Sequence, residues 1–325
     1  MIESFVSIIC LTNIRTTGKL GFMIPNTKPN PSSSLQGKTI VITGATSGIG
    51  LQAAIDFAGL GARVIGVGRD PKRCAKAKEQ ILSKTPKAQV EYLLANLSSQ
   101  PQVRVLAVDI KKVLGQWGQT HLDILINDAG TYSGRRILTE DGTELTMAVN
   151  HYAPFLLTHE LMPMLTAAHE AKVLTVSSGS HYNTNIHVTR TDHPLIYFGL
   201  WAYKVSKLAN VLFTLEFNRR FGKTNVRAYA VDPGLVNTEI AFKGTDPISK
   251  FVWKIRKNSG TLPEVPVRTM LYLAQKSLAT RDGEYYWKDS LPKTPSRVAQ
   301  DPELARQLWE KSCKVCATPD WVREL

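Results

Sequence analysis

Residues 39–50 read TIVITGATSGIG, an apolar β-branched run that leads directly into a turn with three glycines. Val, Ile and Thr favour a buried strand, and a helical pattern follows the turn. Glycine permits a tight turn and lets a phosphate approach the first backbone N–H groups of the helix. This order of strand, turn and helix indicates a dinucleotide site. The residues of the turn that we expect to contact the dinucleotide are Gly44, Ser47, Gly48, Ile49 and Gly50.

From Lys38 onward, short β-branched runs alternate with helical stretches, which is typical of a parallel sheet covered on both faces. The expected strands are 39–43, 63–67, 89–95, 124–127, 172–177 and 226–231, with a seventh short strand around 284–287. The expected helices are near 49–57, 71–83, 103–117, 143–165, 201–221 and 266–277, and a last one starts near residue 302. We predict an α/β fold, namely a single-domain Rossmann fold with a doubly wound parallel sheet of about seven strands.

The first part of the chain differs from the rest in composition. Residues 1–35 end in a stretch rich in proline and serine, which indicates a flexible N-terminal extension, and we expect 36–325 to form one domain. The apolar run 5–11 is far shorter than the about 20 residues that span a bilayer, so we expect no transmembrane segment. Glu3 and the lack of a preceding basic residue argue against a signal peptide, and we expect a cytoplasmic protein.

The chain is strongly basic, with a formal net charge of +13, which suits nucleic acid, an anionic membrane surface or an anionic cofactor. The sequence contains no zinc-finger spacing and no RNA-recognition aromatic motif, so we expect no nucleic-acid partner. Four scattered cysteines are too few for a disulfide framework, which favours a reduced compartment. Cys313 and Cys316 form a lone C-x-x-C pair, but zinc needs two more ligands, and we expect no metal.

Six short motifs follow one another along the chain. They are the turn with spacing G-x-x-x-G-x-G, Asn127-Asp128-Ala129-Gly130, Asn150, the pair Ser177-Ser178, Tyr203-x-x-x-Lys207, and Pro233-Gly234-x-x-x-Thr238. Over about residues 37–288 the chain resembles the short-chain dehydrogenase/reductase family. The long separation between Ser178 and Tyr203 and the stretch TEDG at 139–142 are similar to the retinol dehydrogenase and WW-domain oxidoreductase branch. This resemblance implies an oxidoreductase that moves hydride between NADP(H) and a carbonyl or alcohol.

The active-site chemistry follows from residue types and spacing. Tyr203 and Lys207 are four residues apart on an expected helix, so their side chains share one face. A tyrosine pKa of about 10 is too high for a base at neutral pH, but a nearby ammonium favours the phenolate. We expect Tyr203 to be the general acid and base, and Ser178 to hold the substrate oxygen, with Ser177 as the alternative. The resemblance implies that Asn150 anchors a water that links Lys207 to solvent.

The end of the second expected strand, Gly68-Arg69-Asp70, bears on the choice of cofactor. An acidic residue there binds the ribose hydroxyl of NAD, whereas an arginine accepts the 2′-phosphate of NADP. Gly68 leaves room, and Arg69 offers a planar fork of donors, which favours NADP(H). Asp70 argues the other way, but it can cap the following helix ahead of Pro71.

Two positions depart from the family's pattern. Asn96 stands where the family commonly has an aspartate that touches the adenine, and its amide still offers donors and an acceptor, so we expect binding to survive. Asp128 stands where the family has an asparagine that does a structural job in the sheet. The further cofactor contacts that the resemblance implies are Asn127, Tyr203, Lys207, Val236 and Thr238.

An insertion before the Tyr203 helix is placed to line the substrate pocket. Its aromatic and histidine residues are His181, Tyr182, His187, His193, Tyr197, Phe198 and Trp201. This mostly aromatic lining predicts a small hydrophobic carbonyl or alcohol compound as substrate, with a bulky apolar or aromatic group. The histidine spacing does not match a zinc site. Residues 238–265 resemble the family's substrate lid, in which FVWKIRK at 251–257 is either a solvated lid helix or a peripheral membrane contact. Helices that pair subunits in the family make a homodimer a candidate.

Two further functions fit the same fold. One is a tailoring reductase of secondary metabolism that acts on a polyketide or terpenoid, which product profiling would distinguish. The other is a non-catalytic NADP-binding interaction module. The joint presence of Ser178, Tyr203, Lys207 and Asn150 argues against that second alternative.

Overall fold

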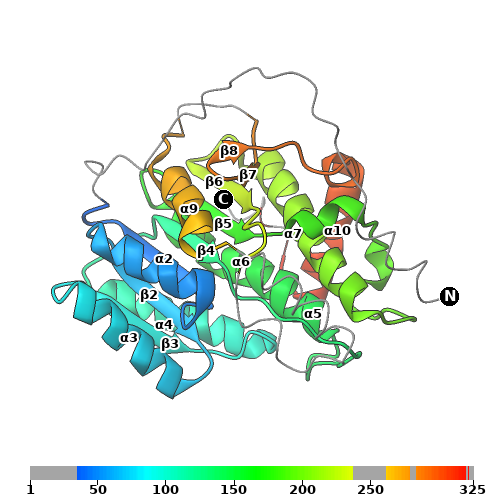
Figure 1. Cartoon of the computed structure of the whole chain (residues 1–325). Coiled ribbons are helices and arrows are strands. Elements are labelled where there is room, and N and C mark those ends of the chain that lie inside the picture. The colour runs from blue at the N-terminus through cyan, green and yellow to red at the C-terminus, as the bar shows by residue number, and fades with distance from the viewer. Residues whose placement is uncertain (1–34, 237–260, 279–282, 320, 322–325) are drawn as a thin grey trace.

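An eight-stranded sheet lies between two layers of helices in the computed structural model, which describes residues 35–236, 261–278, 283–319 and 321 (Figure 1). The strands are β1 (Thr39–Thr43), β2 (Arg63–Gly68), β3 (Val90–Leu94), β4 (Ile124–Asn127), β5 (Ala171–Val176), β6 (Val226–Val231), β7 (Tyr286–Lys288) and β8 (Leu291–Pro292). Their spatial order is β3-β2-β1-β4-β5-β6-β7-β8. β1 to β7 are parallel, which confirms the predicted α/β Rossmann fold.

The seven expected strands are all present, and their ends differ from the expected ones by at most two residues. The short strand β8 comes in addition and pairs antiparallel with β7. The two residues between these strands, Asp289 and Ser290, have φ angles of 52° and 60°, which suit a tight hairpin turn. Leu291–Pro292 contains no β-branched residue, so no propensity signal marks this strand in the sequence.

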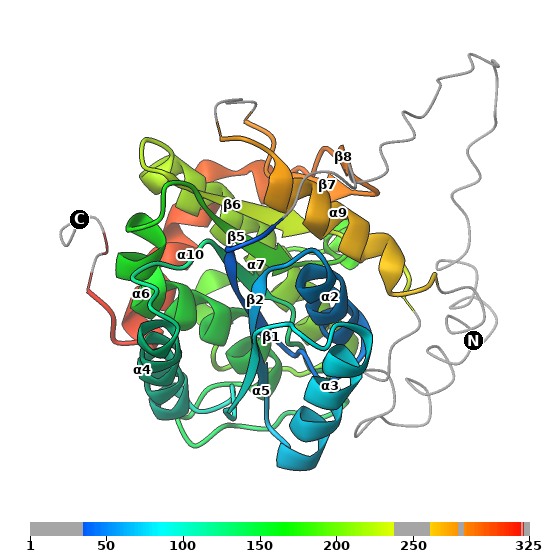
Figure 2. The same cartoon turned by 90° about the vertical axis from the view of Figure 1, so that its left-hand side faces the viewer.

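The helices divide between the two faces of the sheet, as the edge-on view in Figure 2 shows. On one face lie α2 (Gly48–Gly59), α3 (Pro71–Lys84) and α9 (Glu264–Gln275). On the other lie α4 (Gln100–Gln116), α6 (Ala153–Thr166) and α7 (Gly199–Phe221), with α10 (Pro302–Val315) packed against α7. The short helical turns are α5 (Leu145–Met147), η1 (Ala148–Tyr152), η2 (Gly179–Asn183), η3 (Val188–Arg190) and η5 (Val298–Gln300). Most of the expected N-terminal extension and of the expected lid, residues 1–34 and 238–260, lies outside the described residues.

The expected continuous helix over 143–165 is wrong in one respect. The structure divides it into α5, a π-helical turn at η1 and α6. In η1 the backbone N–H of Ala153 donates to the carbonyl of Ala148, five residues back. Pro154 has no N–H, so it cannot provide the donor that an α-helix would direct at the carbonyl of Asn150. The expected site residue Asn150 therefore lies in an irregular turn.

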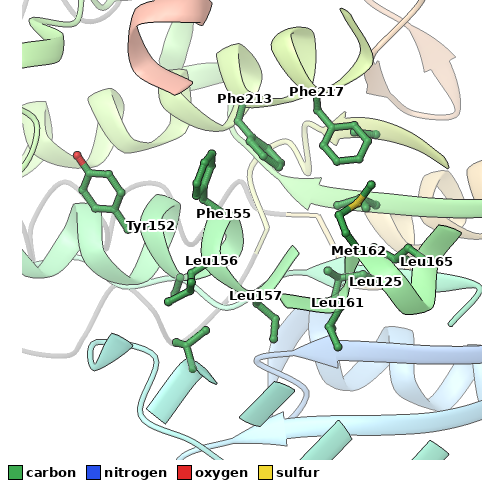
Figure 3. Packing of buried hydrophobic residues seen from close by; sticks show 14 of the residues in the cluster. Leu125, Tyr152, Phe155, Leu156, Leu157, Leu161, Met162, Leu165, Phe213 and Phe217 are labelled. Carbon is green, nitrogen blue, oxygen red and sulfur yellow. The ribbon is translucent and has the colours of Figure 1, made fainter. Parts of the chain in front are cut away.

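Aromatic side chains fill the core on the face that carries α6 and α7. Figure 3 shows Phe155 of α6 directed toward Phe213 and Phe217 of α7. Trp309 of α10 completes this group. Its ring is stacked on Phe213 at 5.7 Å between centroids, and the centroid of the Trp321 ring lies 4.6 Å from that of Trp309. These contacts fix α7, and with it the expected catalytic residues, against the sheet.

We expect Trp309→Ala to lower the free energy of unfolding by about 3–5 kcal/mol, because it leaves a cavity among these rings. Urea unfolding followed by circular dichroism measures this loss. Trp309→Phe is the matched control: the indole N–H has no hydrogen-bond partner among the described residues, so phenylalanine leaves no acceptor unsatisfied and should cost much less. Equal losses in the two variants would contradict this account of the core.

Candidate active site

A cleft of about 380 Å³ lies at the carboxyl ends of the first four strands, where open α/β sheets bind ligands. Its expected cofactor residues are Gly44, Ser47, Gly48, Ile49, Arg69 and Asn96. Residues that sequence reasoning did not assign to the cofactor also line it, among them Arg73, Ser98, Thr131, Leu145 and Val149. These come from four separate segments, so no local pattern could group them. The cleft is large enough to accept part of a dinucleotide.

The glycine turn is held against the segment that follows β4. Gly44 has a φ of 74°, and a Cβ built on it would lie 2.9 Å from the Cα of Ala129. A Cβ on Gly50 would lie 2.6 Å from the carbonyl oxygen of Gly44. Ser47, the N-cap residue of α2, makes no side-chain bond to the helix, which leaves the N–H groups of Gly48 and Ile49 for an anion. The turn therefore fits a pyrophosphate, and Gly50 contributes through close packing, since it does not line the cleft.

The end of β2 is built as a phosphate site would be. Arg69 is exposed in the cleft and makes no hydrogen bond or ion pair with another described residue, so its guanidinium is available. Asp70 Oδ1 accepts a hydrogen bond of 2.9 Å from the backbone N–H of Arg73, which confirms the expected cap of α3. Gly68 lines the cleft, and close packing also limits its size. A Cβ there would lie 2.6 Å from Cys74 Sγ and from Thr46 Cγ2.

Tyr203 and Lys207 lie on one face of α7, as their spacing predicts. The ammonium of Lys207 is 5.7 Å from the centre of the Tyr203 ring. Lys207 is buried, and its Nζ donates to the carbonyl of Val176 at 2.9 Å, which fixes it to the end of β5. A positive charge held at this position stabilises a negative charge on the tyrosine oxygen.

The two adjacent serines after β5 have different environments. Ser177 is buried, and its Oγ donates to the carbonyl of Lys207 at 2.8 Å. Ser178 is half-buried, and its Oγ accepts a hydrogen bond of 3.2 Å from the N–H of Ser180. The Ser177 hydroxyl is thus committed to α7, whereas the Ser178 hydroxyl still has its proton to donate to a ligand.

Asn150 links three parts of the site. Its side-chain oxygen accepts from the N–H of Thr131 at 2.7 Å, and its Nδ2 donates to the carbonyl of Thr131 and to Ser206 Oγ. Ser206 in turn donates to the carbonyl of Tyr203. The side chain of Asn150 is therefore engaged within the protein, and Pro154, four residues further on, has no N–H to donate to its backbone carbonyl. Sequence reasoning gave no role to Ser206, although its position three residues after Tyr203 on the helix was a usable signal.

The carboxyl group of Asp128 and the ammonium of Lys207 influence each other. Burial lowers the pKa of Lys207 to about 8, and the negative charge of Asp128 opposes that shift. Burial also raises the pKa of Asp128 to about 7, opposed by Lys207 and by a hydrogen bond from the N–H of Gly50. Near neutral pH the Lys207 side chain is therefore mostly charged, while the Asp128 carboxyl group is present in both its protonated and its ionised form.

A buried carboxylate connects the loops that follow β5 and β6 with strand β7. Asp232 Oδ1 accepts hydrogen bonds of 3.0 Å from the N–H groups of Gly179 and Gly234, and Oδ2 accepts one from the Tyr286 hydroxyl. The expectation that His181 lines the substrate pocket is wrong. His181 is fully buried, with Nδ1 at 2.8 Å from the carbonyl of Ser178 and Nε2 accepting from the N–H of Ser296.

Two further expected cofactor residues, Asn127 and Val236, do not line the cleft. Asn127 is buried between β1 and β5, and its Nδ2 donates to Thr158 of α6 at 3.4 Å. Val236 pairs with Thr261 in an isolated bridge. Thr238 lies outside the described residues.

Comparisons with known proteins agree with this arrangement. The family model for short chain dehydrogenases matches residues 38–247. The chain belongs to this family. Mouse retinol dehydrogenase 11 is 32% identical over 307 residues, 94% of this chain and 95% of that protein. Human retinol dehydrogenase 13 is 33% identical over 87% of this chain and 86% of that protein. The expected branch of the short-chain dehydrogenase family is thereby confirmed, and the chain is an oxidoreductase that acts on alcohol or carbonyl groups.

Solved structures of short-chain dehydrogenases share the fold. An uncharacterized protein from Mycobacterium paratuberculosis has a TM-score of 0.67 and 29% identity, covering 88% of this chain and 95% of its own. An NADPH-bound carbonyl reductase from chicken fatty liver has a TM-score of 0.61 and 21% identity, covering 80% and 100%. Within the described ranges, no cluster of three or more His, Cys, Asp or Glu side chains could hold a metal ion. No helix in the described part of the chain is both long and apolar enough to cross a membrane.

Proposed function

We propose that this short-chain dehydrogenase interconverts a hydrophobic carbonyl compound and its alcohol with NADP(H), and that Tyr203 is its general acid and base. The observation that carries the proposal is the buried Lys207 ammonium, which lies 5.7 Å from the Tyr203 ring and is fixed to the end of β5. When bound, the nicotinamide supplies or accepts the hydride.

The chain's own residues handle the proton. Tyr203 donates its hydroxyl proton to the substrate oxygen during reduction and takes a proton back during oxidation. Lys207 stabilises the phenolate between these steps, and Ser178 donates a hydrogen bond to the same substrate oxygen. The Asn150 carbonyl binds a water through which Lys207 exchanges protons with solvent.

Exposed apolar side chains just before α7 and in its first turn support a hydrophobic substrate. Ile196 is 90% exposed and Phe198 74% exposed, and Trp201, two residues before Tyr203, is also exposed. Retinol dehydrogenase 11, named for a hydrophobic alcohol, is similar over nearly the whole chain. A retinoid-like aldehyde or alcohol is therefore the substrate class to test first.

The test is NADPH oxidation by the purified chain with a panel of hydrophobic aldehydes and ketones, retinal included. We expect binding of NADPH, seen as a change in its fluorescence, and turnover of at least one hydrophobic carbonyl compound. Failure of both NADPH and NADH to bind would contradict the proposal. Binding with no turnover of any compound on a broad panel would favour a protein that binds the cofactor without catalysis.

We expect Arg69→Ala to weaken NADPH binding about 30-fold, because the variant loses charge-assisted hydrogen bonds to the 2′-phosphate. NADH has no such phosphate, so its dissociation constant should change by less than about twofold. Fluorescence titration with both cofactors gives the ratio of the variant to the wild-type dissociation constant for each. An equal loss for NADPH and NADH would mean that Arg69 does not bind the 2′-phosphate.

A further inference from the structure

Asp128 directs a carboxyl group at the glycine turn. It is the first residue after β4, lines the cleft and is half-buried. A Cβ built on Gly50 would lie 2.7 Å from Asp128 Oδ2, and the N–H of Gly50 donates a hydrogen bond to this carboxyl group. The carboxyl group thus occupies the end of α2 at which the dinucleotide phosphates are expected to bind.

Lys207 is the cation whose charge acts directly on this carboxyl group. The glycine turn and the first turn of α2 contain no ionisable side chain. Other ionisable side chains on the surrounding elements include Tyr203 and Lys204 on α7, His151 on η1, Arg69 and Asp70 after β2, and Arg73 in the first turn of α3. His151 is hydrogen-bonded to Ser312, and β1 lies between β2 and β4. Within the described ranges, Lys207 therefore acts on the Asp128 carboxyl group, while Arg69 and Arg73 line the part of the cleft on the far side of β1.

Bound phosphates would shift the protonation equilibrium of Asp128 toward the neutral carboxyl group. A pyrophosphate brings negative charge to the N-terminus of α2 and displaces water from the cleft, and both effects favour a neutral carboxyl group. Because burial already raises the pKa of Asp128 to about 7, the free protein loses this proton in the physiological range. An asparagine, which the family has here, would carry no such charge.

We propose that Asp128 couples dinucleotide binding to pH: the protonated side chain admits the phosphates, and the carboxylate repels them. The coupling rests on the proposed function, since it requires that a nicotinamide dinucleotide binds in this cleft. Binding above neutral pH then takes up a proton from solvent, and the affinity falls as the pH rises.

The test compares wild type with Asp128→Asn by NADPH fluorescence titration at about pH 5.5 and about pH 8.5. The amide has the shape of the carboxyl group and can still accept from the N–H of Gly50. We expect Asp128→Asn to bind NADPH about tenfold more tightly than wild type at the alkaline pH, and within about twofold at the acidic pH. NADH should give the same ratio, because both cofactors carry the pyrophosphate.

Asp109→Asn is the matched control, since it removes one negative charge from α4 outside the cleft and should not change either dissociation constant. Thermal melts at both pH values verify that the variants are folded. An Asp128→Asn variant that binds no more tightly than wild type at alkaline pH would overturn the coupling, as would a gain confined to NADPH. Absence of binding by either cofactor in wild type would instead contradict the proposed function.

Discussion

Tyr203→Phe should bind NADPH as wild type does and lose about 10³-fold in turnover of any carbonyl substrate that the panel identifies. The substitution removes one hydroxyl group from a half-buried ring whose position is fixed by α7. The substrate oxygen would then receive its proton from water alone, which raises the barrier to the chemical step. Steady-state kinetics and NADPH fluorescence titration on the same preparation separate the loss of turnover from a loss of binding.

A second tyrosine provides the matched control for this result. Tyr285 donates its hydroxyl proton to the carbonyl of Ala299, so its hydroxyl group is already engaged within the protein. Tyr285→Phe therefore removes the same group elsewhere in the protein and should leave turnover within about twofold, even if it costs some stability. Substantial turnover by Tyr203→Phe, at more than about a tenth of the wild-type rate, would rule out this tyrosine as the general acid.

Lys207→Met should lower turnover about 10²- to 10³-fold, because the variant loses the positive charge that stabilises the phenolate. Lys172→Met is an unusually close control. Lys172 is also a buried lysine whose Nζ donates to a carbonyl, that of Ala274 at 2.8 Å, and burial lowers its pKa to about 8 as well. It lies at the opposite end of β5 from Val176, the residue to which Lys207 is bonded, so its loss should affect stability and leave turnover unchanged.

The pH profile gives a second readout for the lysine. The pKa of Lys207 is lowered to about 8, so the ammonium is present below this value and is lost as the pH rises through it. Wild-type turnover should therefore fall above about pH 8. Lys207→Arg, which keeps its charge at every accessible pH, should move this fall upward by at least about one pH unit. A fall at the same pH in the arginine variant would assign it to another group.

Local sequence patterns were sufficient for most of the fold. The run at 39–43 is β-branched and buried on both faces, and β1 has these bounds in the structure. Asp70 followed by Pro71 indicated a helix start, and the carboxylate caps α3 there. Both signals act over a few residues and depend little on the remainder of the chain. The π-helical turn at Asn150 was not predicted, because periodicity continues through it and only the missing N–H of Pro154 marks the position.

The relations between distant segments in the site could not be obtained in this way. Which of Ser177 and Ser178 faces the ligand depends on the carbonyl of Lys207, 30 residues away in the chain from Ser177. His181 was expected to line the substrate pocket. It is instead buried, and its Nε2 accepts a hydrogen bond from the N–H of Ser296, a residue far away in the sequence. A Cβ on Gly50 would meet the carbonyl oxygen of Gly44 at 2.6 Å and also Asp128 Oδ2 at 2.7 Å, and the second of these residues is distant in the sequence.

The sequence by itself determined the family, the strand and helix order, and the spacing that puts Tyr203 and Lys207 on one helix face, because these depend on residues within a few turns of each other. Only the tertiary structure decided the state of the groups around them. The sheet order brings β4 beside β1, so that Asp128 meets the glycine turn, and it brings β5 beside α7, so that Lys207 meets Val176. Burial and nearby charge at these two contacts set the pKa values of Asp128 and Lys207, and both effects arise from neighbours that are distant in sequence.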